Sequence, residues 1–74
     1  MTPEQEAEIR QLAAQLHAAR KRLEAMQYTN VSGLTAEARV KLAEDTAIAY
    51  TNLMTYEFRL GAAQRRIANE AVKS

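Results

Sequence analysis

Apolar residues in the first third of the chain recur on a helical spacing. They are separated by alternating intervals of three and four residues, the spacing of a coiled-coil seam. The members of this seam are Ile9, Leu12, Leu16, Ala19, Leu23 and Met26. Thr2 and Gln5 have the spacing of a capping box, and Pro3 suits the first helical position. The pattern predicts a helix over about residues 3–28.

A turn-rich segment over residues 29–34 follows this helix. It contains Asn30, Ser32 and Gly33, which favour turns over regular structure. Thr35 then has the position of an N-cap, and Ser32 is a competing cap that would start the next helix a turn earlier. We therefore expect a second, longer helix over about residues 35–73.

The second predicted helix carries two apolar seams instead of one. The first seam is Leu42, Thr46, Ala49, Leu53, Tyr56, Leu60, Ala63 and Ile67. The second seam, rotated by roughly a quarter turn, is Val40, Ala43, Ala47, Tyr50, Met54, Gly61 and Ala68. Ile48 and Phe58 lie on or beside the remaining polar strip. One seam can face the first helix, whereas the other needs a further partner.

The run from Thr46 to Tyr56 contains no charged residue, although it lies in the middle of the second helix. A surface helix of a small monomer normally has a charged face at every turn. A domain of 74 residues is also small for a self-sufficient core. The sequence therefore predicts a single all-α domain, residues 1–74, that forms an antiparallel helical hairpin and completes its core as a homo-oligomeric helical bundle.

A short turn would make the two helices antiparallel neighbours. With a tight turn, Leu23 lies near Val40 and Leu42, and Glu4 lies near Arg59. The same alignment places Leu16 near Ala47 and Ala49, and Ile9 near Leu53 and Met54. Residues 61–74 would then extend beyond the hairpin. Gly61 would mark a kink or a close approach of another helix, because glycine is unfavourable inside helices.

Composition removes several classes of protein from consideration. The chain has no Cys and one His, so neither a disulfide framework nor a metal cluster is expected. Ten basic and nine acidic residues give a net charge of +1, which disfavours binding to a nucleic-acid polymer. The acidic N-terminal segment does not resemble a signal peptide, and no stretch approaches the roughly 20 apolar residues of a membrane span. We expect a cytoplasmic protein with no membrane partner.

No catalytic constellation is evident. His17 falls on the predicted solvent side of the first helix and is expected to be an ordinary surface residue. Glu44 and Asp45 are adjacent, so their carboxylates diverge by about 100° on a helix and do not form an acid/base pair. No glycine-rich phosphate loop is present. The sequence predicts a protein that is not an enzyme and uses no cofactor.

The uncharged run nevertheless has the chemistry of a binding site for a small anion. Tyrosine rings can stack on a base, hydroxyl and amide groups can bind base edges, and arginines suit phosphate. The candidate ligand-binding residues are Tyr50, Thr51, Asn52, Thr55, Tyr56, Arg59 and Arg66. The simpler interpretation is that the tyrosines are core aromatics. The arginines of these positions and of the clusters 20–22 and 65–66 would then belong to solvated, locally paired faces.

The run Ile48-Ala49-Tyr50-Thr51-Asn52-Leu53, with Leu60 and Ile67 further on, resembles the IA-x-T-x-L pattern in the long helix of the phage anti-CBASS cyclic-nucleotide sponges. The opening Thr2-Pro3-Glu4-Gln5 and the helix after it also fit their layout. Proteins of this family are small helical hairpins that oligomerise and hold cyclic nucleotides between protomers. This chain departs from the family in having Met54, Tyr56 and Glu57 where a Gln-x-Gly-Phe stretch is usual, and in its longer turn. No ligand-contacting residue is carried over.

Two classes of function follow from these patterns. In the first, the chain is a self-assembling, non-enzymatic binding protein that sequesters a cyclic nucleotide or another small anionic ligand at subunit interfaces. In the second, it is an adaptor or inhibitor, a hairpin dimer that presents helix faces to a host protein. An RNA-binding hairpin dimer ranks third, because a net charge of +1 suits it poorly.

Overall fold

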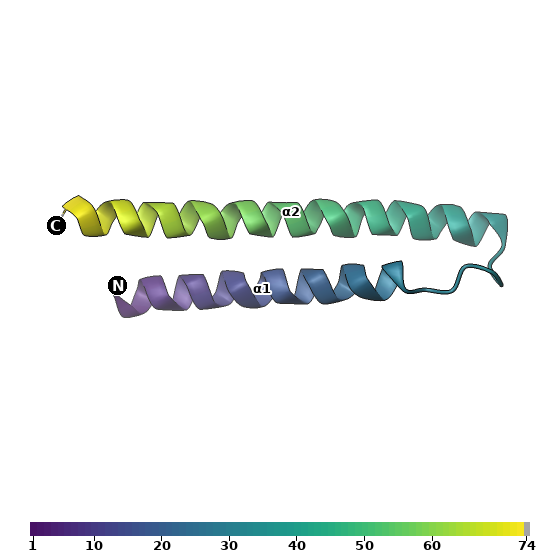
Figure 1. Ribbon diagram of the computed structural model, residues 1–74, viewed down its shortest axis with the longest axis horizontal. Helices are drawn as coiled ribbons and strands as arrows, with labels where there is room; N and C mark the ends of the chain where they lie inside the picture. The colour runs from purple at the N-terminus through teal and green to yellow at the C-terminus, as the bar shows by residue number, and fades with distance from the viewer. Residues whose placement is uncertain (74) are drawn as a thin grey trace.

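The computed structural model describes residues 1–73 and contains two α-helices that run antiparallel along each other (Figure 1). Helix α1 spans Pro3–Gln27 and helix α2 spans Ala36–Lys73. The molecule is a rod of 59 × 15 × 13 Å, and residues 1–73 contain no strand. The expected all-helical architecture of two packed helices is confirmed. Ser74, the last residue of the expected overhang, lies outside the described residues.

The helix starts follow from their capping residues. The Thr2 hydroxyl accepts a hydrogen bond from the backbone N–H of Gln5. The backbone N–H of Thr2 donates to the side-chain carbonyl oxygen of Gln5, which completes the capping box of α1. The Thr35 hydroxyl accepts from the Ala38 N–H at 3.1 Å, so Thr35 caps α2. Ser32, the competing cap, instead donates to the Asn30 side chain within the loop. Each satisfied cap removes an orphan N–H from a helix end.

The core lies between α1 and the first seam of α2. Every member of the α1 seam and of the first α2 seam is buried or half-buried. The most buried side chains are Leu16, Leu23, Ala49, Ala63 and Ile67. No large side chain among residues 1–73 is fully buried, because two helices enclose only one layer of contacts. The hairpin core is therefore thin.

The alignment of the two helices differs from the expected one by roughly three helical turns. Gln5 binds Glu70, Glu8 pairs with Arg66, and Arg20 pairs with Glu57 at 3.4 Å. The last turns of α2 therefore pack on the first turns of α1, and the expected C-terminal overhang is wrong. So are the expected proximities of Leu23 to Val40, Leu16 to Ala47, Ile9 to Met54 and Glu4 to Arg59.

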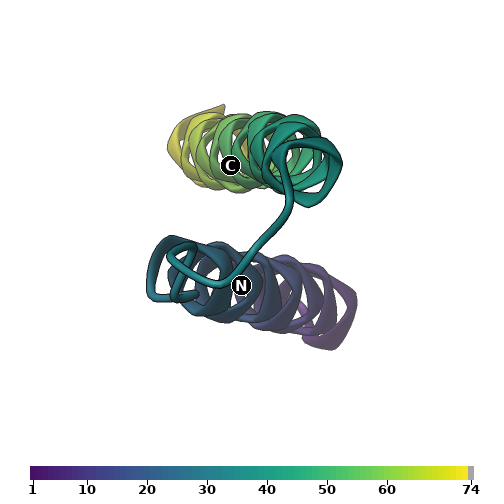
Figure 2. The ribbon, with the colours of Figure 1, turned by 90° about the vertical axis from the view of Figure 1, so that its right-hand side faces the viewer.

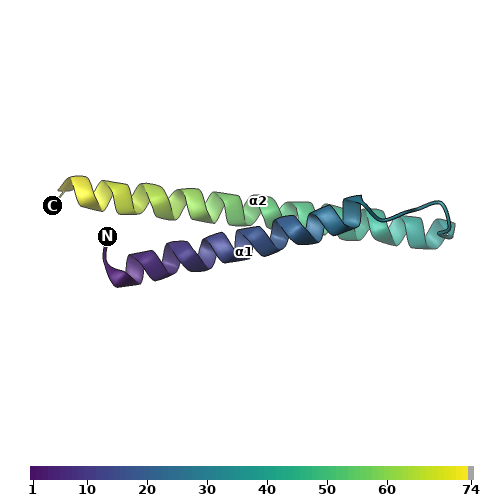
Figure 3. The same ribbon diagram turned by 60° about the horizontal axis from the view of Figure 1, so that its bottom comes forward.

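The path of the connecting segment explains this shift. The chain does not reverse directly after α1 but first runs alongside the first turns of α2, as Figure 3 shows. The reversal follows at residues 31–34, where the Leu34 N–H donates to the Val31 carbonyl at 3.1 Å. The Arg39 guanidinium donates to the Val31 carbonyl at 3.2 Å, which holds the segment in this position. The overhang consequently lies at the N-terminal end of α2, which extends beyond the end of α1 (Figure 1).

Helix α2 continues through Gly61 without interruption and leaves one side uncovered. In the end-on view of Figure 2, α1 lies against a single side of α2. The neighbouring side, rotated from the first seam and here called the outer face, comprises the second seam together with Phe58, Arg65 and Val72. Three of its residues, Ala43, Ala47 and Tyr50, also line an open groove beside Leu23 and Met26 of α1. The side chains of the outer face are exposed except at the half-buried Gly61. The second seam is thus left without a partner in the single hairpin.

Candidate functional site

The seven predicted ligand-binding residues lie on different sides of α2. Tyr56 is half-buried and faces α1, whereas Tyr50 is exposed on the outer face. The Thr51 and Thr55 hydroxyls donate to the carbonyls of Ala47 and Thr51 at 3.0 and 2.9 Å. These threonines therefore direct their protons to their own helix and retain only acceptor capacity toward a ligand. One hairpin does not bring all seven residues into a single pocket.

Two of the seven, Asn52 and Tyr56, share a groove between the helices. The groove has a volume of about 230 Å³. Its other lining residues are Gln15, Ala18, Ala19 and Arg22 from α1 and Ala49 from α2. The lining therefore combines three alanines, which leave space, with amide, phenol and guanidinium groups. These groups can donate to and accept from a polar ligand.

One arginine lines this groove, a second lies beside its tyrosine, and both are free of ion pairs among the described residues. Arg22 lines it from α1. The Arg59 guanidinium carbon lies 5.8 Å from the centre of the Tyr56 ring, a cation–π distance. Within residues 1–73 neither arginine forms an ion pair with a carboxylate. The groove thus combines an aromatic ring, two amides and one uncompensated positive charge, with the second charge of Arg59 next to the ring.

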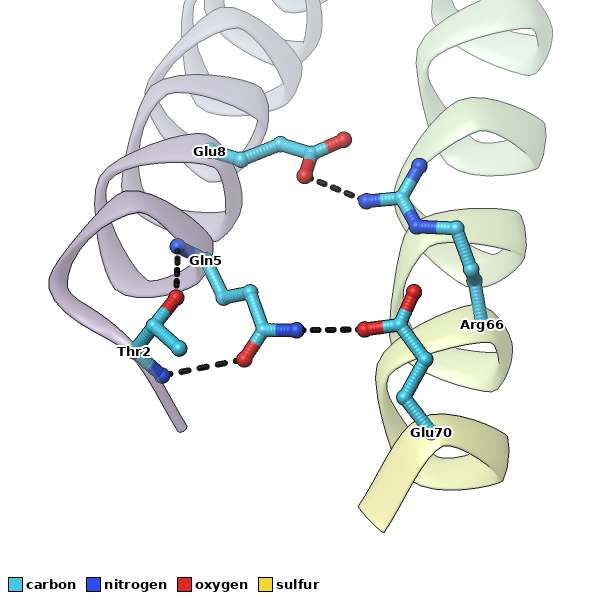
Figure 4. A network of polar contacts seen from close by, with 5 residues as sticks. All are labelled: Thr2, Gln5, Glu8, Arg66 and Glu70. Carbon is cyan, nitrogen blue, oxygen red and sulfur yellow. Dashed lines mark hydrogen bonds and ion pairs between the residues drawn. The ribbon is translucent and has the colours of Figure 1, made fainter. Parts of the chain in front are cut away.

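Arg66 lies elsewhere, at the end of the hairpin that holds the N-terminus (Figure 4). Its guanidinium pairs with the Glu8 carboxylate, and the adjacent Glu70 accepts a hydrogen bond from Gln5. Both members of the Arg66–Glu8 pair are partly exposed, so the pair contributes little to stability and is screened by salt. Ligand binding by Arg66 would require exchange of this carboxylate for the ligand.

The sequence marks Arg22 only as part of the basic cluster 20–22, a possible anion site, and gives no signal for Gln15. The two residues lie seven residues apart on α1 and therefore share one side of the helix. That spacing is visible in the sequence, but their neighbours on α2 depend on the alignment of the helices. The tight-turn alignment placed other residues opposite them.

The remaining structural findings concern catalysis, metals and membranes. His17 is exposed on α1. No group of three or more His, Cys, Asp or Glu side chains that could hold a metal ion occurs within residues 1–73. Neither described helix is long and apolar enough to cross a membrane.

Comparison of the chain with protein-family models, with curated proteins and with solved structures found no match.

Proposed function

We propose that the chain is a non-enzymatic, self-assembling protein that sequesters a small anionic ligand, a cyclic nucleotide, in the interhelical groove. The observation that carries this proposal is a groove that Tyr56, Asn52 and the unpaired Arg22 line together, with the unpaired Arg59 beside the Tyr56 ring. The ring provides a stacking surface, the amide can bind a base edge, and the arginines can bind phosphate.

The size of the groove supports a site shared between copies. Small-molecule pockets usually enclose about 300–1,000 Å³, and this groove of about 230 Å³ is smaller and open to solvent. A cyclic nucleotide in the groove would project beyond it and would need a second wall. A further copy of the hairpin supplies that wall in this account. The resemblance of residues 48–53 to the anti-CBASS sponges supports the same arrangement.

The experiment is calorimetric titration of cyclic di- and trinucleotides into the wild-type protein and into Arg22→Gln. Loss of one charge-assisted contact should weaken binding by roughly ten- to a hundredfold. Arg10→Gln is the matched control, because Arg10 is exposed on the side of α1 away from the groove. Binding should be unchanged in this control. No heat from any cyclic nucleotide at tens of micromolar protein would exclude the sequestration function.

A second candidate is an adaptor or inhibitor that presents the outer face of α2 to a host protein. The specific observation in its favour is the exposure of apolar side chains along that face, Phe58 among them. Large exposed apolar patches commonly mark interaction sites. Melting temperatures distinguish the two functions. A ligand that binds only the folded state raises the melting temperature, whereas an adaptor would show no rise with any cyclic nucleotide.

A further inference from the structure

The outer face of α2 is apolar at its centre and strongly exposed. Tyr50 is 55% exposed, Met54 48% and Phe58 71%. Val40 and Val72 extend this apolar surface toward the two ends of the helix, and both are also exposed. The face therefore runs along nearly the whole length of α2, which matches an extended helix better than a compact ligand.

The residues of the outer face are arranged symmetrically about Met54. Tyr50 and Phe58 lie four residues on either side of it, and Ala47 and Gly61 lie seven residues on either side. If two α2 helices meet antiparallel with Met54 at the two-fold axis, the aromatic rings meet each other. Ala47 of one helix then meets Gly61 of the other, so the two backbones can approach closely there. The outer face of one copy is thus complementary to the outer face of a second, antiparallel copy.

Gly61 has no role within the hairpin that requires the absence of a side chain. A Cβ atom at this position would meet only the Arg65 guanidinium, at 3.4 Å, which is ordinary van der Waals contact with a flexible side chain. Glycine nevertheless disfavours a helix interior relative to alanine. Close approach of a second helix on the outer face accounts for a glycine here.

Charge selects the antiparallel orientation over the parallel one. Glu44 and Arg65 lie on the same edge of the outer face, ten and eleven residues from Met54 in opposite directions. Antiparallel pairing places Glu44 of one copy beside Arg65 of the other. Parallel pairing would instead bring each of these residues level with the same residue of the other copy, so that no opposite charges meet. Among the described residues neither side chain forms an ion pair within its own hairpin.

We infer that two copies of this chain pair antiparallel through the outer faces of their α2 helices, with Met54 at the two-fold axis. The inference rests on the self-assembly part of the proposed function and specifies one of its interfaces. The groove is lined from α2 by Ala49, Asn52 and Tyr56, which are not part of the outer face, so the copy that closes the groove is a different one. Each α2 helix then packs on its own α1 through the first seam and on the α2 of the partner copy through the second seam, so both of its apolar seams are covered.

Disulfide crosslinking tests this pairing without background, because the chain contains no cysteine. Met54→Cys should form a covalent dimer with itself under mild oxidation. Val40→Cys and Ala68→Cys, fourteen residues on either side of Met54, should each stay uncrosslinked alone but form a mixed dimer when combined. Ala14→Cys, on an exposed part of α1, gives the level of crosslinking that arises from random collision.

A charge-reversal series checks the same register by a separate measurement. Glu44→Lys and Arg65→Glu should each weaken dimerisation by about tenfold, and the double variant should recover most of the wild-type affinity. Both positions are exposed in the hairpin, so circular dichroism should show unchanged helix content.

The outcomes separate the pairing from self-assembly itself. A wild-type mass equal to one chain at tens of micromolar would overturn both the self-assembly and the pairing. An oligomer in which Val40→Cys crosslinks to itself, or in which Met54→Cys does not, would overturn the antiparallel pairing alone. Self-crosslinking of Met54→Cys together with the mixed Val40–Ala68 dimer would establish it.

Discussion

The side-chain amide of Gln5 donates a hydrogen bond to the Glu70 carboxylate, with 2.6 Å between Nε2 and Oε2. The carbonyl oxygen of the same Gln5 side chain accepts from the Thr2 N–H, so the N-terminal cap of α1 is tied directly to the last turns of α2 (Figure 4). The two contacts use the nitrogen and the oxygen of the same side-chain amide. They hold the two helices in the observed alignment at the open end of the hairpin.

Whether the Gln5–Glu70 hydrogen bond forms in solution can be tested by replacing the amide of Gln5 with a carboxylate, alone and together with the reverse replacement at Glu70. Gln5→Glu keeps the acceptor for the cap but places a carboxylate against Glu70, so it should lower the free energy of unfolding by about 0.5–1 kcal/mol. The double variant Gln5→Glu/Glu70→Gln should recover that loss, because one donor and one acceptor face each other again. Urea denaturation of the double-mutant cycle measures the coupling. Additive effects of the two changes would show that the contact does not form in solution.

Truncation of the core should be costly only in the seam between the helices. Leu16 is buried in that seam, so Leu16→Ala should lower the free energy of unfolding by about 2–5 kcal/mol. Thr55 is exposed and bonds only to its own helix, so Thr55→Ala should be nearly neutral. Denaturation at one fixed protein concentration provides the comparison, because oligomerisation makes stability depend on concentration. Similar losses in the two variants would mean that the seam is assigned incorrectly.

Substitution of Gly61 tests whether a second helix approaches α2 closely at this position or whether α2 merely tolerates a glycine there. Gly61→Leu should leave the hairpin folded but dissociate the oligomer, because the added side chain projects from the outer face. Ala14→Leu, on the exposed side of α1, is the matched control and should leave the oligomer intact. Light scattering with circular dichroism checks both properties. An oligomer that accepts leucine at position 61 rules out close approach there.

Arg59 should contribute to ligand affinity without contributing to assembly. Its guanidinium lies over Tyr56 at the edge of the groove and away from the outer face. Arg59→Ala should therefore weaken cyclic-nucleotide binding by roughly ten- to a hundredfold, while the oligomeric mass stays constant. Calorimetry and light scattering on the same preparation measure both. Unchanged affinity would remove Arg59 from the site, and loss of the oligomer would place it in an interface.

Local features of the fold were predictable from the sequence, whereas the alignment of the helices was not. Thr2 and Gln5 identify the start of α1 because capping chemistry acts over four residues, and the spacing of Leu16 and Leu23 identifies the buried side of α1. The alignment depends on the path of residues 28–35, which is held by the contact of Arg39 with the Val31 carbonyl. No short-range pattern encodes such a contact.

The candidate site was only partly predictable for the same reason. Asn52 and Tyr56 are recognisable on α2 as polar and aromatic groups within an uncharged run. Their neighbours Gln15 and Arg22 come from α1, and their proximity follows from the alignment set by the loop. Tyr50 shares the uncharged run but points to the outer face, where it belongs to the proposed interface.

Native mass spectrometry of the protein purified after expression in cells tests self-assembly and ligand sequestration in one measurement, because it reports copy number and bound small molecules together. We expect an even-numbered multiple of the 8.3 kDa chain that carries additional mass corresponding to a cyclic nucleotide or gains it when one is added. A bare 8.3 kDa monomer that binds no cyclic nucleotide at tens of micromolar would contradict it.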